Sequence, residues 1–184
     1  MTDRDVKHML ALYDGEIAQA DSYLERILNH AKKSGLDKNT IFIFMSEHGD
    51  LFGEHGRFMR GGPLRGTFYN PVLNFPLLIK HPALDQEIRV SSLAQTVDLL
   101  PTLLDMLDIE VPVGLDGESL VVDIEGPGRA TRPDALSENM LFAEERASIR
   151  TPERKYVRWL SGKQEIYSLS DDPREQVDLA GIEA

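Results

Sequence analysis

Residues 41–60, with the sequence IFIFMSEHGDLFGEHGRFMR, begin with a continuous apolar run and then become abruptly polar. The run at residues 41–45 is rich in β-branched and aromatic side chains, which predicts a strand buried on both faces, as in a parallel sheet. Open α/β sheets bind their ligands at the carboxyl ends of strands. A functional site is therefore expected in the polar residues that follow, beginning with Glu47 and His48.

The side chains of this loop suit a divalent metal. Carboxylate oxygen and imidazole nitrogen are suitable ligands, and the loop offers Glu47 with His48 and then Glu54 with His55. A cation, Arg60, closes the stretch. A surface loop with solvated histidines explains the same residues about equally well, because a Glu–His pair alone is a weak signal. Three glycines allow the backbone to turn tightly in either case.

Residues 46–60, SEHGDLFGEHGRFMR, resemble the metal-binding loop of sulfatases, a family within the alkaline phosphatase superfamily. That loop typically contains Ser-Asp-His/Asn-Gly, then Gly-x-His-Gly, then a lysine. The resemblance implies that Glu47 and His48 bind a divalent metal, with calcium first and manganese or zinc as alternatives. It gives Arg60 the place of the lysine that contacts sulfate or phosphate oxygens. His55 takes a place at the rim of the site, as a hydrogen-bond donor or in loop packing.

Two residues depart from the family pattern. Glu47 replaces the usual aspartate, so the ligand arm is longer by one methylene. Arg60 replaces the lysine, which keeps the charge but substitutes a planar fork for a point donor. The chemistry of the loop is therefore retained, whereas its geometry is altered.

The chain has no cysteine, which excludes disulfides and thiolate zinc sites. Sulfatases carry their nucleophile in a Cys/Ser-x-Pro-x-Arg motif. The two Pro-x-Arg sequences here have Gly61 and Arg150 at the nucleophile position, and neither can serve. The resemblance implies that the nucleophile and two further acidic ligands belong to the first half of a full-length chain. We therefore expect this chain alone to bind metal weakly and to have no hydrolase activity.

Residues from about 4 to 34 predict one long helix, because apolar side chains recur at alternating three- and four-residue spacing. Thr2 or Asp3 can cap its start, and Gly35 suits its C-terminal end. A similar helix in sulfatases packs on the main sheet, so the apolar stripe is expected to be covered.

Two further elements are expected after the loop. Residues 67–69 are few enough to lie over the site, and residues 75–80 predict a strand. Residues 94–108 predict a helix with Pro101 in its first turn and apolar side chains on most of its circumference, which indicates burial. Around Asp98 this helix resembles the sulfatase sequence Val-Asp-Leu-x-Pro-Thr-Leu, which implies a capping role for Asp98.

The C-terminal region predicts a small antiparallel sheet, because alternating strands and tight turns follow a glycine- and proline-rich stretch. The expected domains are residues 1–123 as the C-terminal half of the α/β core, 124–137 as a linker, and 138–184 as a small antiparallel subdomain. The predicted fold class is α/β: the C-terminal part of an alkaline-phosphatase-like sheet flanked by helices, with a small antiparallel C-terminal sheet.

Composition excludes some partners. The 184 residues carry a formal net charge of −11, which argues against nucleic acid and anionic membranes. The sequence contains no apolar stretch of membrane-spanning length and no apolar signal region at its N-terminus. As written it predicts a soluble cytoplasmic chain, although a signal peptide would lie in the missing half.

The function predicted from the resemblance is that of a sulfatase-type hydrolase portion acting on an anionic sulfate or phosphate ester. The alternative within the superfamily is a phosphatase or phosphonate hydrolase. A different class of function is a non-catalytic pseudoenzyme or interaction module, which pairs with a separate N-terminal half or with itself. An exposed sheet edge and uncovered apolar faces would favour such pairing.

Overall fold

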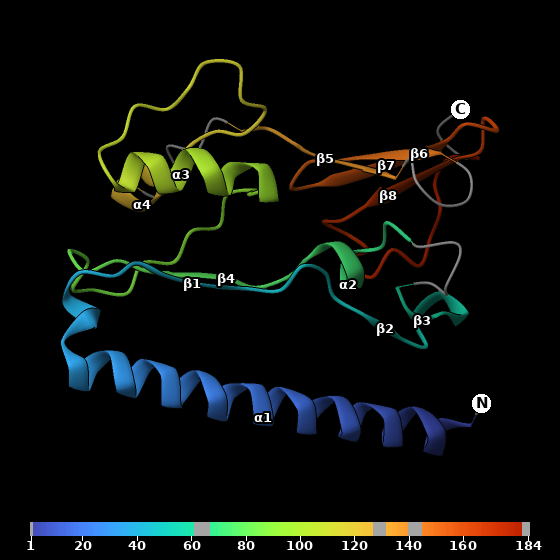
Figure 1. The fold of residues 1–184 in the computed structure, drawn as a ribbon. Helices are drawn as coiled ribbons and strands as arrows, with labels where there is room; N and C mark the ends of the chain where they lie inside the picture. Colours follow the sequence, from blue (N-terminus) through green and yellow to red (C-terminus); the bar gives the residue numbers. More distant parts are fainter. Residues whose placement is uncertain (1, 61–66, 127–131, 140–144, 182–184) are drawn as a thin grey trace. The chain divides into compact units, whose positions relative to one another are not determined.

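The computed structural model describes residues 2–60, 67–126, 132–139 and 145–181 (Figure 1). Its contacts divide the chain into two compact units, Met1–Gln86 and Glu87–Ala184. Gly61, one of the two residues at the nucleophile position, lies outside the described residues, as do residues 127–131 of the predicted linker. Among the described residues, no helix is both long enough and apolar enough to cross a bilayer.

The first unit opens with the long helix α1, Asp3–Ser34, whose ends are set by local hydrogen bonds. Thr2 and Asp5 form a capping box: the Thr2 amide donates to the Asp5 carboxylate at 2.7 Å, and the Asp5 amide donates to Thr2 Oγ1 at 3.4 Å. Gly35 ends the helix in the left-handed conformation, with φ of 75°. The predicted start and end are both confirmed.

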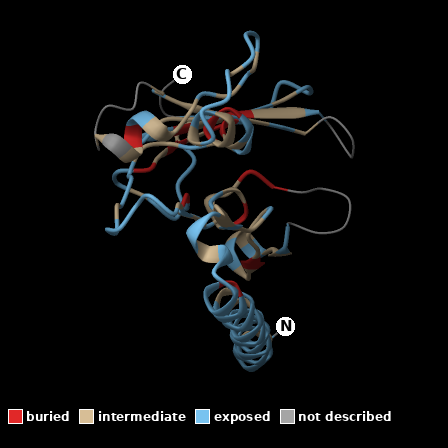
Figure 2. Cartoon of the chain, turned by 60° about the vertical axis from the view of Figure 1, so that its left-hand side comes forward, coloured by how far each residue is buried: buried red, intermediate tan, exposed pale blue. Residues whose placement is uncertain are grey.

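The apolar stripe of α1 is mostly exposed, contrary to the expectation that it is covered. Figure 2 shows the helix in the exposed colour along almost its whole length, and only Ala31 is buried. Ile17 is 53% exposed and Ile27 59%. The helix contacts the site region where the ring of Tyr13 packs edge-on against Phe52, with the ring centroids 4.8 Å apart.

The predicted strand is present as β1, Phe42–Met45, but its pairing differs from the prediction. It pairs antiparallel with β4, Leu77–Lys80, in a two-stranded sheet. Phe44 lies opposite Leu78 and both remain exposed, at 44% and 58%. The expectation of a parallel strand buried on both faces is therefore wrong. Within the described residues β1 has one neighbouring strand, so an edge and the face that carries Phe44 and Leu78 stay uncovered.

A short connection and a hairpin complete this unit. The 3-10 turn η1, Leu36–Lys38, links α1 to β1. After β1, strands β2 (Leu51–Phe52) and β3 (Phe58–Met59) pair around the 3-10 turn η2, Glu54–Gly56. The short helix α2, Asn70–Leu73, precedes β4. The buried apolar residues of the unit are few: Ala31, Leu51, Phe68 and Val72.

The second unit begins with the 3-10 turn η3, Thr96–Asp98, which runs directly into α3, Leu99–Met106. Pro101 lies in the first turn of α3, as predicted. The predicted burial of this helix is only partly correct. Pro101 and Thr102 are buried, but Leu100 is 53% exposed, so its apolar circumference is not covered all round. Helix α4, Val121–Glu125, follows.

Asp98 is the N-cap residue of α3, but its side chain makes no capping hydrogen bond to that helix, so the predicted capping role is not observed there. Its carboxylate instead caps the preceding turn η3 and joins three segments of this unit. The residue is fully buried, and its carboxylate accepts from the Gln95 amide at 2.7 Å and the Glu118 amide at 2.9 Å. The Arg132 guanidinium also donates to it at 2.8 Å. A buried carboxylate is tolerated when hydrogen bonds and a cation compensate it, as they do here.

The small antiparallel sheet is confirmed, with strand order β5-β6-β7-β8. Its strands are β5 Ala135–Asn139, β6 Arg146–Arg150, β7 Arg154–Trp159 and β8 Gln164–Ser168. β5 begins inside the range expected as a linker, while the domain boundaries at residues 123 and 137 stay predictions. The side chains of Lys155 and Glu175 form a fully buried ion pair. Burial lowers the pKa of Lys155, and the Glu175 carboxylate opposes that effect.

Candidate functional site

The polar loop starts where β1 ends and is held in place by α2. Ser46 Oγ donates to the carbonyl of His48 at 2.6 Å, which closes the first turn. The Gly49 amide donates to the Val72 carbonyl at 2.8 Å. A Cβ added at Gly49 would lie 2.0 Å from the Pro71 carbonyl oxygen, so only glycine permits this close approach. The position of His48 therefore depends on a backbone contact with α2.

His48 and Glu47 place two possible metal-ligand atoms side by side. His48 Nδ1 lies 3.0 Å from the Gly49 carbonyl, which can only accept, so Nδ1 carries the hydrogen. In the neutral ring, Nε2 then has a free lone pair, and it lies 3.1 Å from Glu47 Oε1. A hydrogen bond from one ring nitrogen to a backbone carbonyl is the arrangement that orients metal-ligating histidines.

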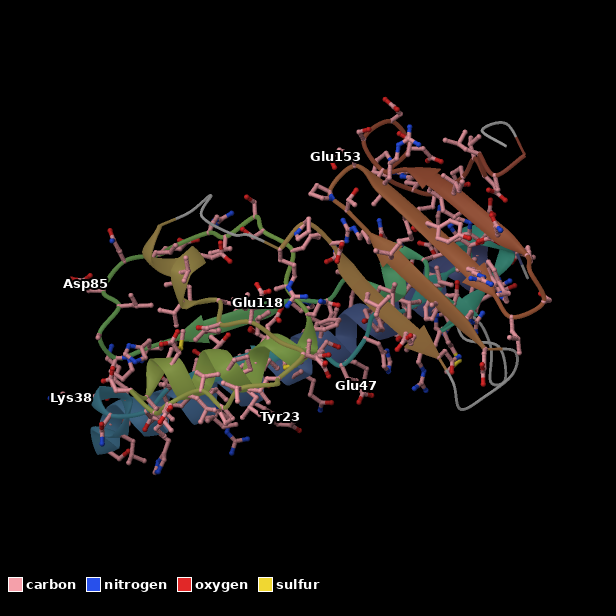
Figure 3. The ribbon with its side chains drawn as sticks, turned by 90° about the horizontal axis from the view of Figure 1, so that it is seen from above. Tyr23, Lys38, Glu47, Asp85, Glu118 and Glu153 are labelled. Atoms are coloured by element: carbon pink, nitrogen blue, oxygen red, sulfur yellow. The ribbon has the colours of Figure 1, made fainter. Side chains whose placement is uncertain are left out.

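The spacing of these two atoms fits one metal ion. Because protein ligand atoms lie about 2.0–2.6 Å from a bound ion, two atoms 3.1 Å apart could both contact the same ion. The Glu47 side chain, labelled in Figure 3, is 85% exposed and His48 is 29% exposed, so the pair is open on one side. Two acceptor atoms this close repel each other unless a proton or a cation lies between them.

The pair does not form a complete site. Among the described residues there is no group of three or more histidine, aspartate or glutamate side chains that could hold a metal ion. Calcium takes six to eight oxygen ligands and even zinc takes three or four protein ligands. The described residues thus fit a metal as part of its ligand set, and the remaining ligands have to come from elsewhere.

His55 is held in an unusual conformation in η2. Its φ is 54°, in the left-handed region that non-glycine residues seldom adopt. Its ring stacks on that of Tyr69, with centroids 3.6 Å apart and planes within 4°. Tyr69 belongs to residues 67–69, and whether this segment covers the site stays a prediction. His55 Nε2 is buried and has no hydrogen-bond partner within the described part of the chain.

Arg60 and Glu54 take other positions. Glu54 accepts a hydrogen bond from the Phe52 amide at 2.6 Å, so it stabilises the hairpin. Arg60 is exposed just after β3, and continuing the hairpin register places it opposite Asp50. No hydrogen bond or ion pair within the described part of the chain joins Arg60 to the Glu47–His48 pair. The structure thus brings Glu47 and His48 together, fixes His55 separately, and leaves Arg60 as a predicted anion contact.

Sequence reasoning did not identify the backbone contact of Gly49 or the stacking of His55 on Tyr69. The only signal for either was indirect: a glycine inside the loop and an aromatic residue in the segment after it. Neither pattern specifies which distant atoms meet.

Comparison with known proteins gives consistent matches. A sequence model of the sulfatase family matches residues 1–109. The chain is 29% identical to arylsulfatase K of Bos taurus over 97% of this chain and 34% of that protein. A solved structure in complex with its substrate, D-glucosamine-2-N,6-O-disulfate, is 28% identical with a TM-score of 0.81, covering 91% of this chain and 35% of that one. The phosphonate monoester hydrolase of Agrobacterium radiobacter is 27% identical with a TM-score of 0.83, covering 98% and 39%. The chain spans about a third of the length of the curated relatives it matches.

Proposed function

This chain belongs to the sulfatase family, and we propose that it is the C-terminal portion of a hydrolase of sulfate esters that carries part of the divalent-metal site. The observation that carries the proposal is the Glu47–His48 pair. His48 Nε2 and Glu47 Oε1 are 3.1 Å apart, and the other ring nitrogen of His48, Nδ1, is held by a hydrogen bond to the Gly49 carbonyl. Calcium is the proposed ion, because the family resemblance of the loop implies it and Glu47 offers carboxylate oxygen.

The roles of the chain's own residues follow from their chemistry. Glu47 Oε1 and His48 Nε2 would hold the ion, and the hydrogen bond of Nδ1 to the Gly49 carbonyl would keep His48 in the tautomer that leaves Nε2 free. When bound, a divalent ion supplies Lewis acidity toward the ester oxygens. Arg60, which is exposed, would neutralise charge on the transferring group. His55 provides a ring nitrogen at the rim. The nucleophile comes from the part of the fold outside this chain.

Substrate class is proposed at the level of an anionic sulfate ester. The relative solved with a disulfated glucosamine supports this, since it is 28% identical over 91% of the chain. The second candidate is a phosphonate or phosphate monoester, because the Agrobacterium hydrolase matches this chain about as well in fold and identity. The identity of the nucleophile, which these residues do not supply, would distinguish the two.

The proposal is tested by titrating calcium into the chain and following histidine signals by NMR. We expect saturable binding at roughly 10⁻⁴–10⁻³ M, weaker than calcium sensors, because the described residues supply only two ligands. Glu47→Ala/His48→Ala should abolish it. The matched control is Asp85→Ala/His81→Ala, which removes an acid and a histidine elsewhere in the same unit and should leave binding unchanged.

Equal calcium binding by the wild type and the Glu47→Ala/His48→Ala variant would refute the assignment of the site. Hydrolytic activity is a separate readout. We expect no turnover of an aryl sulfate by the purified chain, and turnover that Glu47→Ala abolishes would show that the chain holds a complete site.

A further inference from the structure

Two features fix the imidazole of His55: its backbone conformation and the contact of its ring with Tyr69. The backbone is left-handed at φ of 54°, and a non-glycine residue keeps that conformation only when its surroundings impose it. The ring lies face to face with Tyr69 at 3.6 Å, closer than the 4.5–7 Å typical of aromatic pairs. Tyr69 is therefore the contact that imposes the orientation of the His55 ring.

The burial of His55 Nε2 without a hydrogen bond gives an independent indication of a ligand. This nitrogen is buried and makes no hydrogen bond to the residues that the structure describes, whereas buried polar atoms in proteins are nearly always paired. A hydrogen-bonding atom withdrawn from water without a partner destabilises the fold. A buried Nε2 without a partner is explained if the ester, or another group outside this chain, forms a hydrogen bond with Nε2 in the complete site.

The element that carries Tyr69 also supports the metal pair. Tyr69 is the N-cap residue of α2, and its carbonyl accepts from the Val72 amide at 3.0 Å. The Val72 carbonyl in turn accepts from the Gly49 amide, next to His48. One short helix thus contacts the loop at Gly49 and at His55, so it sets the positions of both histidines.

We propose that Tyr69 is a positioning residue of this site. Its ring fixes the imidazole of His55, so that the unpartnered Nε2 is presented in one orientation to the ester that the complete site binds. The inference rests on the proposed function for the identity of the ligand. The positioning itself is a property of this chain and can be measured without a metal or a substrate.

The test uses the histidine ring signals of the full 184-residue chain, whose five histidines are few enough to assign by substitution. Stacking on Tyr69 places the His55 ring protons in the shielding region of the tyrosine ring. We expect the His55 signal to be the most upfield of the five. Tyr69→Phe should retain that displacement because it keeps the ring, and Tyr69→Leu should abolish it. The control Tyr23→Leu removes a half-exposed tyrosine from α1 and should leave the His55 signal in place.

A calcium arm separates this inference from the proposed function. If His48 responds to calcium but the His55 signal is the same in Tyr69→Leu as in the wild type, the positioning role is refuted and the metal site stands. If His48 does not respond to calcium while Tyr69→Leu releases His55, the positioning role stands and the proposed metal site is refuted. Loss of the displacement in Tyr69→Phe as well would also overturn the role, because the conservative ring would have failed to replace the tyrosine.

Discussion

Replacing Gly49 with alanine tests whether the contact between the loop and α2 holds the candidate site. Gly49 is not among the glycines with a left-handed φ, so alanine can adopt its backbone conformation. The penalty is therefore steric. An added Cβ would lie 2.0 Å from the Pro71 carbonyl oxygen, and real Cβ atoms essentially never approach an atom within 3.0 Å. Because the neighbour is backbone, loop and helix must separate by about 1 Å or more.

The expected loss of stability combines two effects. Forcing an extra methyl group into a packed contact costs about 1–3 kcal/mol. The hydrogen bond from the Gly49 amide to the Val72 carbonyl is lost as the segments separate, which costs about 0.5–1.5 kcal/mol. Together these give about 2–4 kcal/mol, a large part of the stability of a small unit. The carbonyl of Gly49 moves as well, so His48 loses its fixed tautomer and calcium binding should weaken.

The matched control is Gly15→Ala in the middle of α1, where an added Cβ would meet nothing within 4 Å. That change should stabilise by about 0.5–1 kcal/mol, since glycine is a poor helix residue. Urea unfolding followed by circular dichroism at a helix wavelength reports on the first unit through its long helix, and fluorescence of the single Trp159 reports on the second. Equal midpoints for the two alanine variants, or unchanged calcium binding in Gly49→Ala, would refute the reasoning.

Two further predictions concern ionised groups. Lys155→Met leaves the buried Glu175 carboxylate without its cation and should destabilise the second unit by about 3–5 kcal/mol. The double variant Lys155→Met/Glu175→Leu should recover most of that stability, as measured by Trp159 fluorescence during urea unfolding. Equal destabilisation by the single and double variants would contradict this prediction. The hydrogen bonds from Thr2 lower the pKa of Asp5 below 3.8, so its contribution to the α1 cap is complete above 3.8 and is lost as the pH falls through the lower folded value. Helicity should therefore decrease in acid, and Thr2→Ala should remove the part of that decrease that arises at the N-terminus.

Sequence patterns predicted the elements whose determinants are local. Thr2 and Gly35 bound α1 correctly because a capping box and a left-handed glycine act within a few residues of each end. The adjacency of Glu47 and His48 at the end of β1 is equally local, since the two residues are neighbours in the chain. The assignment of these two residues to a metal, and of His55 and Arg60 to the ester, stays a prediction.

Features that depend on distant atoms were not predictable. The partner of β1 is 35 residues further along, and an apolar run does not say whether that partner is parallel or antiparallel. The apolar face of α1 predicts that another surface packs against it, but the sequence does not say whether that surface belongs to the same chain. Its exposure at Ile17 and Ile27 shows that this unit does not supply it.

The hairpin also contains backbone strain that its own sequence does not explain. His55 and Met59 both have left-handed φ values, 54° and 55°, and each such residue costs on the order of 1–3 kcal/mol. The unit holding them has few fully buried apolar side chains, so it has little stability in excess. Strain kept under those conditions is better explained by a required geometry than by packing. The hairpin carries the stacked imidazole of His55, and the loop before it carries the Glu47–His48 pair, so the strain lies in the segment to which we assign the proposed site.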